Sequence, residues 1–264
     1  MPHSKDIKDD GRRPKLSTSN TSLSLLDLAE HLVAYGRKKG ADEIEVTVQE
    51  GNEFSVDIRL GEIENLIEAG SRYVSFRLNK DNKVASATSS DMELKTLERL
   101  LEHALARATL ANPDPFVGLP ELSSSTFDPE ALQLYDPTVP EISSEAKIAL
   151  AKQTEALALE AKEISNSHGA SLETREIRSV LANSNGFLFS YPETFCFLGV
   201  SLQAGDTNDL VEGYWGSSNR FFQDLESPEE IAQKAVQRTL RQLNPRKIPT
   251  QNVPVIFEPE MTSW

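Results

Sequence analysis

Apolar positions along the first half of the chain change their spacing twice, from a helical period to a strand period and back. Between Ser24 and Tyr35 they lie three and four residues apart, which predicts an amphipathic helix. Over residues 44–60 and 74–88 they alternate with polar residues, which predicts half-buried antiparallel strands. A second helix with one apolar face is predicted over residues 94–108. The first half is therefore expected to be a helix–sheet–helix unit.

Turn and cap residues are expected to divide this unit into its elements. Gly51-Asn52 lies between two alternating runs, and this pair predicts a hairpin turn that joins two short strands. Gly40 is expected to end the first helix. Ser90 and Asp91 are expected to cap the second helix.

The second half of the chain repeats this order of elements. Ser143 or Ser144 is placed to cap a helix, and Gly169 is expected to end it. The face of this helix that packs inward is expected to carry Ala146, Leu150, Leu157, Ala161 and Ile164. Strands are predicted over residues 172–183, 186–191, 195–204 and 211–215. A last helix is predicted to open at residues 227–230, where Ser, Pro and Glu form a capping box.

Proline marks the main boundary, because six of the fourteen prolines fall within residues 112–140, which predicts an ordered crossing loop or a linker. The fold class is therefore predicted to be α+β, with two helix–antiparallel sheet–helix units. The apolar run at residues 253–257 predicts the first strand of a third, β-rich domain that is truncated. The expected division is a flexible tail over residues 1–20, a first domain over 21–111, a linker over 112–142, a second domain over 143–244 and the start of the third over 245–264.

Composition excludes several classes of partner and setting. The chain has 264 residues and a formal net charge of −14, which argues against nucleic acid and against an anionic membrane surface. No apolar run approaches the roughly 20 residues that span a bilayer, and the N-terminal residues do not resemble a secretory signal. The single cysteine, Cys196, excludes an intrachain disulfide and favours a reducing, cytoplasmic setting.

Catalytic motifs are not evident in the sequence. None of the four histidines has a second histidine three to five residues away, and HExxH, GxSxG, P-loop and GxGxxG motifs do not occur. His31 and His103 are expected at the edges of helix faces. Cys196 lies between phenylalanines and is expected to be a small core residue, because an apolar setting suppresses thiolate formation. No catalytic residue and no metal ligand is therefore assigned.

Two segments remain as candidate binding elements. Asn185 lies in an Asn-Ser-Asn-Gly turn, which either joins two strands or contacts a ligand. Tyr214, Trp215 and Arg220 belong to a cluster of aromatic residues that includes a guanidinium. This cluster is compatible with core packing under a helix, and also with contact to a peptide or a partner protein, where Tyr, Trp and Arg are favoured.

The order of several short segments resembles the N-terminal portion of the TldD/PmbA family, also called modulators of DNA gyrase or metallopeptidases. These segments are more similar to the PmbA (TldE) branch of the family than to the TldD branch. The matching segments are ADEIEV (41–46), LGEIEN (60–65), NSNG (183–186), GYW (213–215), SPE (227–229), RTL (238–240) and RKIPT followed by VPVIF (246–257).

This resemblance implies a subunit of a cytosolic zinc-protease system in which TldD- and PmbA-like chains pair as a heterodimer and degrade unfolded peptides. TldD-like chains carry an HExxxH zinc motif just after the strand that begins here at Val253, and this sequence ends at Trp264 without one. No family zinc ligand is carried over, so zinc is expected only in a TldD-like partner and this chain alone is expected to be inactive. The implied partners are a TldD-like subunit or a second copy, and a peptide substrate, but neither nucleic acid nor a membrane.

Overall fold

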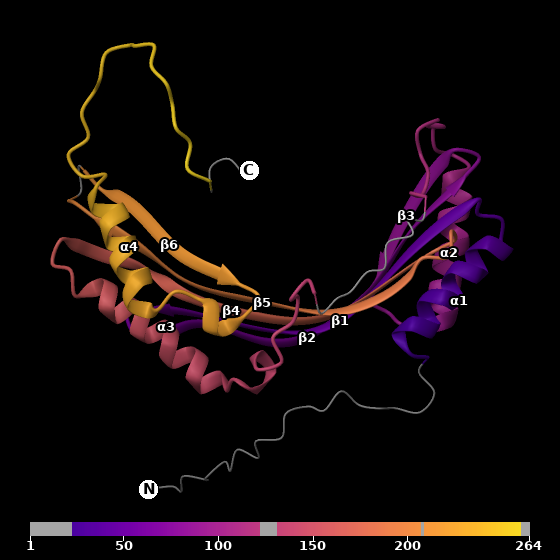
Figure 1. The fold of residues 1–264 in the computed structure, drawn as a ribbon, viewed down its shortest axis with the longest axis horizontal. Coiled ribbons are helices and arrows are strands. Elements are labelled where there is room, and N and C mark those ends of the chain that lie inside the picture. Colours follow the sequence, from indigo (N-terminus) through magenta and orange to yellow (C-terminus); the bar gives the residue numbers. More distant parts are fainter. Residues whose placement is uncertain (1–22, 122–130, 207–208, 260–264) are drawn as a thin grey trace, which may run out of the picture. The chain divides into compact units, whose positions relative to one another are not determined.

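The computed structural model describes residues 23–121, 131–206 and 209–259, and it confirms the α+β fold class (Figure 1). The predictions for residues 1–20, 123–125 and 260–264 lie outside this part of the chain. The described helices are α1 (Leu25–Lys38), α2 (Leu94–Ala108), α3 (Ser144–Leu159) and α4 (Pro228–Leu240), with short 3₁₀ turns at Val139–Glu141 and Phe222–Asp224. The strands are β1 (Glu43–Arg59), β2 (Glu62–Lys80), β3 (Lys83–Ser89), β4 (Ile164–Asn183), β5 (Leu188–Ala204) and β6 (Val211–Asn219).

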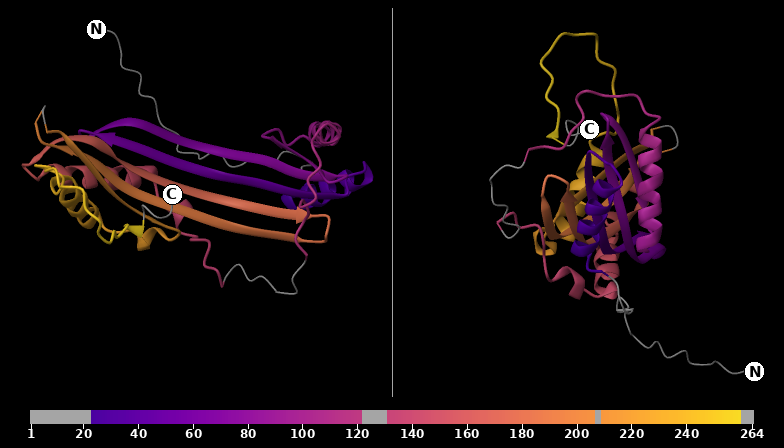
Figure 2. Two further views of the ribbon diagram at one scale, coloured as in Figure 1. Left: turned by 90° about the horizontal axis from the view of Figure 1, so that it is seen from above. Right: turned by 90° about the vertical axis from the view of Figure 1, so that its right-hand side faces the viewer.

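The described strands form one sheet in the order β3-β2-β1-β4-β5-β6, and Figure 2 shows the four long strands side by side. The chain divides into two compact units. Unit 1 comprises the described residues up to Glu53, together with Ala69–Tyr135 and Arg175–Thr194. Unit 2 comprises Phe54–Glu68, Asp136–Thr174 and the described residues from Phe195 onward. Each of the strands β1, β2, β4 and β5 therefore contributes one part to each unit.

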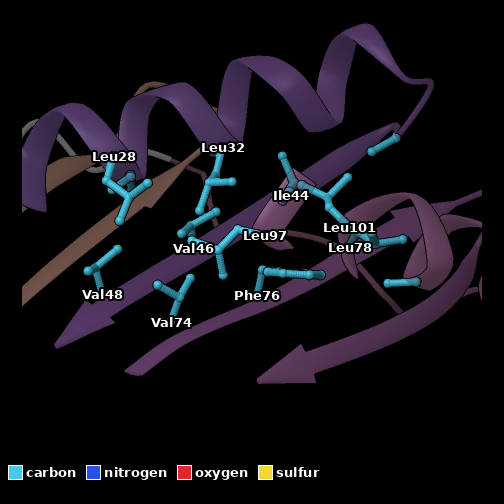
Figure 3. Packing of buried hydrophobic residues seen from close by; sticks show 14 of the residues in the cluster. Leu28, Leu32, Ile44, Val46, Val48, Val74, Phe76, Leu78, Leu97 and Leu101 are labelled. Atoms are coloured by element: carbon cyan, nitrogen blue, oxygen red, sulfur yellow. The ribbon is translucent and has the colours of Figure 1, made fainter. Parts of the chain in front are cut away.

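The core of unit 1 lies between the helix pair α1–α2 and one face of its strands. Figure 3 shows Leu28 and Leu32 of α1 and Leu97 of α2 meeting the strand residues Val46 and Phe76. All five side chains are at most 5% exposed. The predicted apolar faces of both helices are confirmed, because the residues that these helices bury are all apolar or glycine.

Helix caps in unit 1 only partly match the prediction. Ser24 caps α1 and forms a reciprocal capping box with Asp27. The prediction that Ser90 and Asp91 cap α2 is wrong, because Glu93 holds the cap position, and its side chain makes no capping hydrogen bond. Asp91 is instead used in the preceding turn, where its carboxylate accepts a hydrogen bond from the Glu93 backbone N–H at 2.9 Å.

The core of unit 2 lies between its strands and the helix pair α3–α4, which packs on one face of them (Figure 1). Ile58, Leu172, Leu198 and Leu202 bury their side chains there against Ile231 of α4. The predicted capping box at the start of α4 is confirmed: the backbone N–H of residue 230 donates to the hydroxyl of residue 227, and the carboxylate of residue 230 accepts in return.

The predicted inward face of α3 is only partly right. Ala146 is exposed, and Leu150 and Leu157 are half-buried at the margin of the core. Ala161 and Ile164 lie beyond the helix, Ala161 half-buried and Ile164 buried at the start of β4. The face that α3 buries instead carries Lys147, Ala151, Thr154, Glu155 and Ala158. These polar groups tolerate burial because they are bonded, and the small alanines let the helix approach the strands. The helix also ends at Leu159, and Gly169 belongs to β4.

Two buried charges hold α3 to the strands. The Lys147 ammonium donates to the Thr174 hydroxyl at 2.9 Å and lies 4.7 Å from the centre of the Phe54 ring. The Glu155 carboxylate accepts the backbone N–H of Leu60 at 2.9 Å and of Gly61 at 2.8 Å. Glu155 is 1% exposed, so it fixes the β1–β2 turn from inside the unit.

The predicted hairpin at Gly51-Asn52 is wrong, because β1 runs through both residues without a break. A Cβ at Gly51 would lie 2.4 Å from the carbonyl oxygen of Glu176 on β4. Glycine is therefore required there by the close approach of a neighbouring backbone and not by a turn. The turn between β1 and β2 is at Leu60 and Gly61, whose φ angles are 51° and 80°. β5 is likewise one strand where two were predicted.

The predicted strand at residues 253–257 is not formed. Residues 244–258 carry no helix or strand, and the large apolar side chains from Val253 to Phe257 are 52–95% exposed. A strand needs a partner for its backbone groups, and no described strand lies beside this segment in the sheet order.

Candidate functional site

The four candidate binding residues lie in different surroundings. Asn185 is in the β4–β5 turn of unit 1, where its side-chain amide donates to the Pro120 carbonyl at 3.2 Å. Tyr214 and Trp215 are neighbours on β6 in unit 2 and so point to opposite faces of the sheet. Arg220 follows β6 with its side chain exposed. Their role as peptide or partner contacts stays a prediction.

Trp215 faces α4. A Cβ at Gly213, two residues earlier on the same face, would lie 2.6 Å from Thr239 Oγ1 of α4, so glycine permits the helix to approach β6. The Trp215 indole N–H donates to Glu226 at 2.8 Å, and this hydrogen bond restrains the orientation of the ring. Lys234 Nζ lies 5.2 Å from the ring centre and Arg238 Cζ lies 4.8 Å from it. Both distances are typical of cation–π contact.

A pocket with a volume of about 240 Å³ adjoins this ring. It is lined by Trp215, Lys234, Gln237, Arg238 and Arg241. Lys234, Gln237 and Arg238 are on α4 and Arg241 is its C-cap residue. Counted from Lys234, the other three follow after three, four and seven residues, which places the four on one helix face. The pocket therefore combines an aromatic wall with three cationic side chains.

Two carboxylates border this cationic surface. Glu226 accepts from Lys234 Nζ at 2.7 Å, and Glu258 accepts from Arg238 Nη2 at 2.6 Å and from Arg241 Nη2 at 3.2 Å. Burial raises the pKa of Glu226, but hydrogen bonds from Lys234 and Trp215 outweigh it and hold that pKa below its usual value. The pKa of Glu258 is lowered chiefly by its hydrogen bond from Arg238. Both groups are therefore carboxylates at neutral pH.

The opposite face of β5 and β6 carries aromatic side chains of another kind. The Phe197 ring lies over two glycines, because Cβ atoms at Gly199 and Gly216 would approach it to 2.7 and 2.6 Å. Gly199 and Gly216 are direct partners across the strands. Tyr214 is on this same face and is 56% exposed. This face thus presents the Phe197 ring, packed on the two glycines, and the exposed Tyr214 ring.

The outer edge of β2 in unit 2 is a third candidate surface. β3 pairs with β2 only from Val74 to Lys80, so the described sheet leaves residues 62–68 of β2 paired on one side alone. Every residue of this stretch is exposed. Ile63, Leu66 and Ile67 are 42–46% exposed, which is typical of a strand edge that another chain covers.

Other potentially reactive groups are held in structural contacts. His31 bonds to Glu98 at 2.8 Å and His168 bonds to Glu212 at 3.2 Å. Cys196 is fully buried, as predicted, and burial raises the pKa of its thiol to about 11. A second cavity, beside Asn79, has a volume of only about 10 Å³, enough for one water molecule.

The sequence analysis did not identify Lys234, Gln237 and Arg238 of α4, the C-cap residue Arg241, or Glu258. The periodicity of α4 could have shown the basic residues on one helix face. Their proximity to Trp215 and Glu258 depends on tertiary packing, which the sequence pattern does not specify.

No helix in the described part of the chain is both long and apolar enough to cross a membrane.

Comparison with protein-family models gives two matches in sequence order. Residues 44–108 match the PmbA/TldA metallopeptidase domain 1, and residues 137–243 match the PmbA/TldA metallopeptidase central domain.

Curated relatives carry the same family name. The chain is 32% identical over 232 residues to metalloprotease PmbA of Escherichia coli O157:H7, a match that covers 88% of this chain and 50% of that protein. It is 32% identical over 226 residues to the PmbA homologue of Haemophilus influenzae, covering 85% and 49%. The chain therefore spans about half the length of these curated relatives.

Solved structures share the fold. A modulator-of-DNA-gyrase protein of Bacteroides thetaiotaomicron matches with a TM-score of 0.72 and 24% identity, over 84% of this chain and 50% of that one. TldE of Thermococcus kodakarensis matches with a TM-score of 0.64 and 19% identity, over 80% and 46%.

Proposed function

The chain belongs to the PmbA/TldD metallopeptidase family, and we propose that it binds a partner subunit and peptides within a zinc-peptidase assembly that degrades unfolded peptides. We assign it the binding role because an exposed strand edge of the described sheet offers a surface for it. Its proposed setting is the cytoplasm. The partner is a TldD-like subunit, as the structural likeness to a TldE protein suggests, and a second copy of this chain is the alternative.

The free edge of β2 carries this proposal. Over residues 62–68 it presents backbone groups that no described strand pairs, together with three exposed apolar side chains, Ile63, Leu66 and Ile67. A strand from a partner can add to such an edge by backbone hydrogen bonds, while alternate side chains provide specificity. Tyr214, Phe197 and Arg220 of the same unit are proposed as further contacts for peptide.

The described residues do not fit a zinc site. Zinc in peptidases is held by three or more His, Cys, Asp or Glu side chains, and residues 23–121, 131–206 and 209–259 bring no such group together. We therefore derive no catalytic step through zinc from these residues.

Placing lysine at the β2 edge is expected to weaken partner binding at least tenfold. In the double variant Ile63→Lys/Ile67→Lys, two charges would oppose burial of the edge against another strand. Affinity for a TldD-like subunit is measured by isothermal titration calorimetry, and self-association by sedimentation velocity. The control Ala106→Lys/Ala156→Lys adds the same charge at exposed helix positions. Equal affinity of both double variants would exclude the edge as the partner site.

The alternative function is peptide hydrolysis by this chain itself, as its family name suggests. We expect the purified chain to contain no stoichiometric zinc and to leave an unfolded polypeptide such as reduced casein intact, because its described residues offer no site for the metal. Metal analysis and a fluorogenic cleavage assay test both points. One zinc per chain together with cleavage would establish the alternative.

A further inference from the structure

We propose that the pocket lined by Trp215, Lys234, Gln237, Arg238 and Arg241 binds a glutamate side chain of an extended peptide, in exchange for Glu258, the internal carboxylate that bonds to its two arginines. The proposed function supplies one element of this inference, namely that the natural ligand is a peptide. The carboxylate chemistry of the site follows from the contacts themselves.

The cationic face of α4 has the donors that a carboxylate requires. Both carboxylate oxygens of Glu258 are used, one by Arg238 at 2.6 Å and the other by Arg241 at 3.2 Å. Guanidinium groups present planar pairs of N–H donors, and these match the two oxygens of a carboxylate better than an ammonium does. Arg238 is also stacked against Trp215, so its position is set before a ligand arrives.

Space remains beside this ion pair. Glu258 does not line the pocket of about 240 Å³, although it contacts two of the residues that do. The internal carboxylate thus occupies the arginine donors but makes no described contact with Trp215, whose ring packs against Lys234 and Arg238 and still lines the pocket. When the glutamate of a peptide binds the arginines, a neighbouring side chain of that peptide can pack on the part of the Trp215 ring that lines the pocket.

The segment that carries Glu258 is weakly held apart from this contact. Residues 251–258 form no strand or helix. Ile256 is 95% exposed and Phe257 is 66% exposed, so the apolar residues before Glu258 contribute little burial. The Glu258 side chain is 43% exposed, so its ion pair with the arginines is open to solvent on one side, and another carboxylate can exchange with it.

The test uses Trp215 fluorescence in the full chain. The chain has two tryptophans, and Trp264→Phe leaves Trp215 as the reporter. The probe is the peptide QNVPVIFEP, residues 251–259 with blocked ends, titrated into this background with and without Glu258→Gln. We expect the Glu258→Gln chain to bind the probe at least tenfold more tightly, because the internal competitor is lost. A second probe, in which glutamine replaces the single glutamate of the peptide, is expected to bind this chain at least tenfold more weakly than the first probe.

Variants of the arginines distinguish the pocket from general charge attraction. In the Glu258→Gln background, Arg238→Ala/Arg241→Ala is expected to lose at least 90% of the affinity for the probe. Arg99→Ala/Arg178→Ala removes two exposed guanidinium groups of unit 1 and is expected to bind as before. Chemical denaturation of each variant reports whether it is folded, and Arg238→Lys/Arg241→Lys, which keeps the charge, is expected to recover only part of the affinity.

Three results would overturn the inference: equal affinity with and without Glu258→Gln, equal affinity for the glutamate and glutamine probes, or equal loss in both arginine double variants. A glutamine probe with a free C-terminus that binds as tightly as the glutamate probe would also overturn it, by assigning the site to terminal carboxylates. These readouts are independent of the β2 edge. Loss of partner binding alone contradicts the proposed function, and loss of glutamate selectivity alone contradicts this inference.

Discussion

Glu155→Ala is expected to lower the free energy of unfolding by about 4 kcal/mol, because it removes the acceptor of two backbone N–H groups at once. The carboxylate is 1% exposed and bonds to Leu60 at 2.9 Å and to Gly61 at 2.8 Å. Without it, both donors of the β1–β2 turn face a cavity at the inner side of α3. Equilibrium denaturation in urea, followed by far-ultraviolet circular dichroism, measures the loss.

Two further variants make this expectation specific. Glu155→Gln keeps the shape of the side chain but offers one acceptor in place of two, so about half of the loss is expected, about 2 kcal/mol. Glu160→Gln makes the same chemical change at an exposed position just beyond the same helix, and its effect is expected to stay within about 0.5 kcal/mol. Similar stability of Glu155→Ala and wild type would show that the turn is not held from within.

Gly51→Ala is expected to destabilise the fold by about 3 kcal/mol, the upper range for an overpacked site. The added methyl group would lie 2.4 Å from the Glu176 carbonyl oxygen and 3.2 Å from Ile177 Cα. Both contacts are backbone atoms of β4, so relief requires β1 and β4 to move apart and to weaken their pairing. The transition midpoint in urea reports the loss.

Gly70→Ala is the matched control for this substitution. Gly70 is also a strand glycine of unit 1, in β2, but the nearest atoms to an added Cβ are 3.7 and 3.8 Å away. Alanine is therefore expected to be neutral or slightly stabilising there. If Gly51→Ala were equally harmless, the hairpin turn predicted from the sequence would describe this position better than a continuous strand does.

The buried faces of α1 and α2 were predicted from the sequence, and that of α3 was not. In α1 and α2, leucines and alanines repeat at helical spacing and nothing else competes for the core. In α3 the spacing of apolar residues selects the wrong face, because Lys147 and Glu155 turn inward to partners that the helix sequence does not contain. A buried charge is recognised only from its partner, and here the partners are Thr174 on β4 and the backbone of the β1–β2 turn, both distant in sequence.

Strand lengths were underestimated for a similar reason. Glycine in a strand pattern ordinarily indicates a turn, but Gly51 is set by the backbone of β4, which lies more than a hundred residues further along the chain. The candidate site shows the same limit. Trp215 was selected as an aromatic residue of interest, whereas Arg238 and Glu258 become neighbours only after α4 packs on β6 and the following segment returns.

The alternation of the chain between two units has a consequence for its synthesis on the ribosome. The core around Val46 in unit 1 includes Val180 and Ala182 of β4, and Ala182 follows Val46 by 136 residues. At roughly 5–20 residues per second, about 7–30 s pass before those residues have been made. Throughout this interval β1 lacks its neighbour β4. The nascent chain is therefore expected to need a chaperone along that strand, and unit 1 cannot be completed before much of unit 2 has been translated.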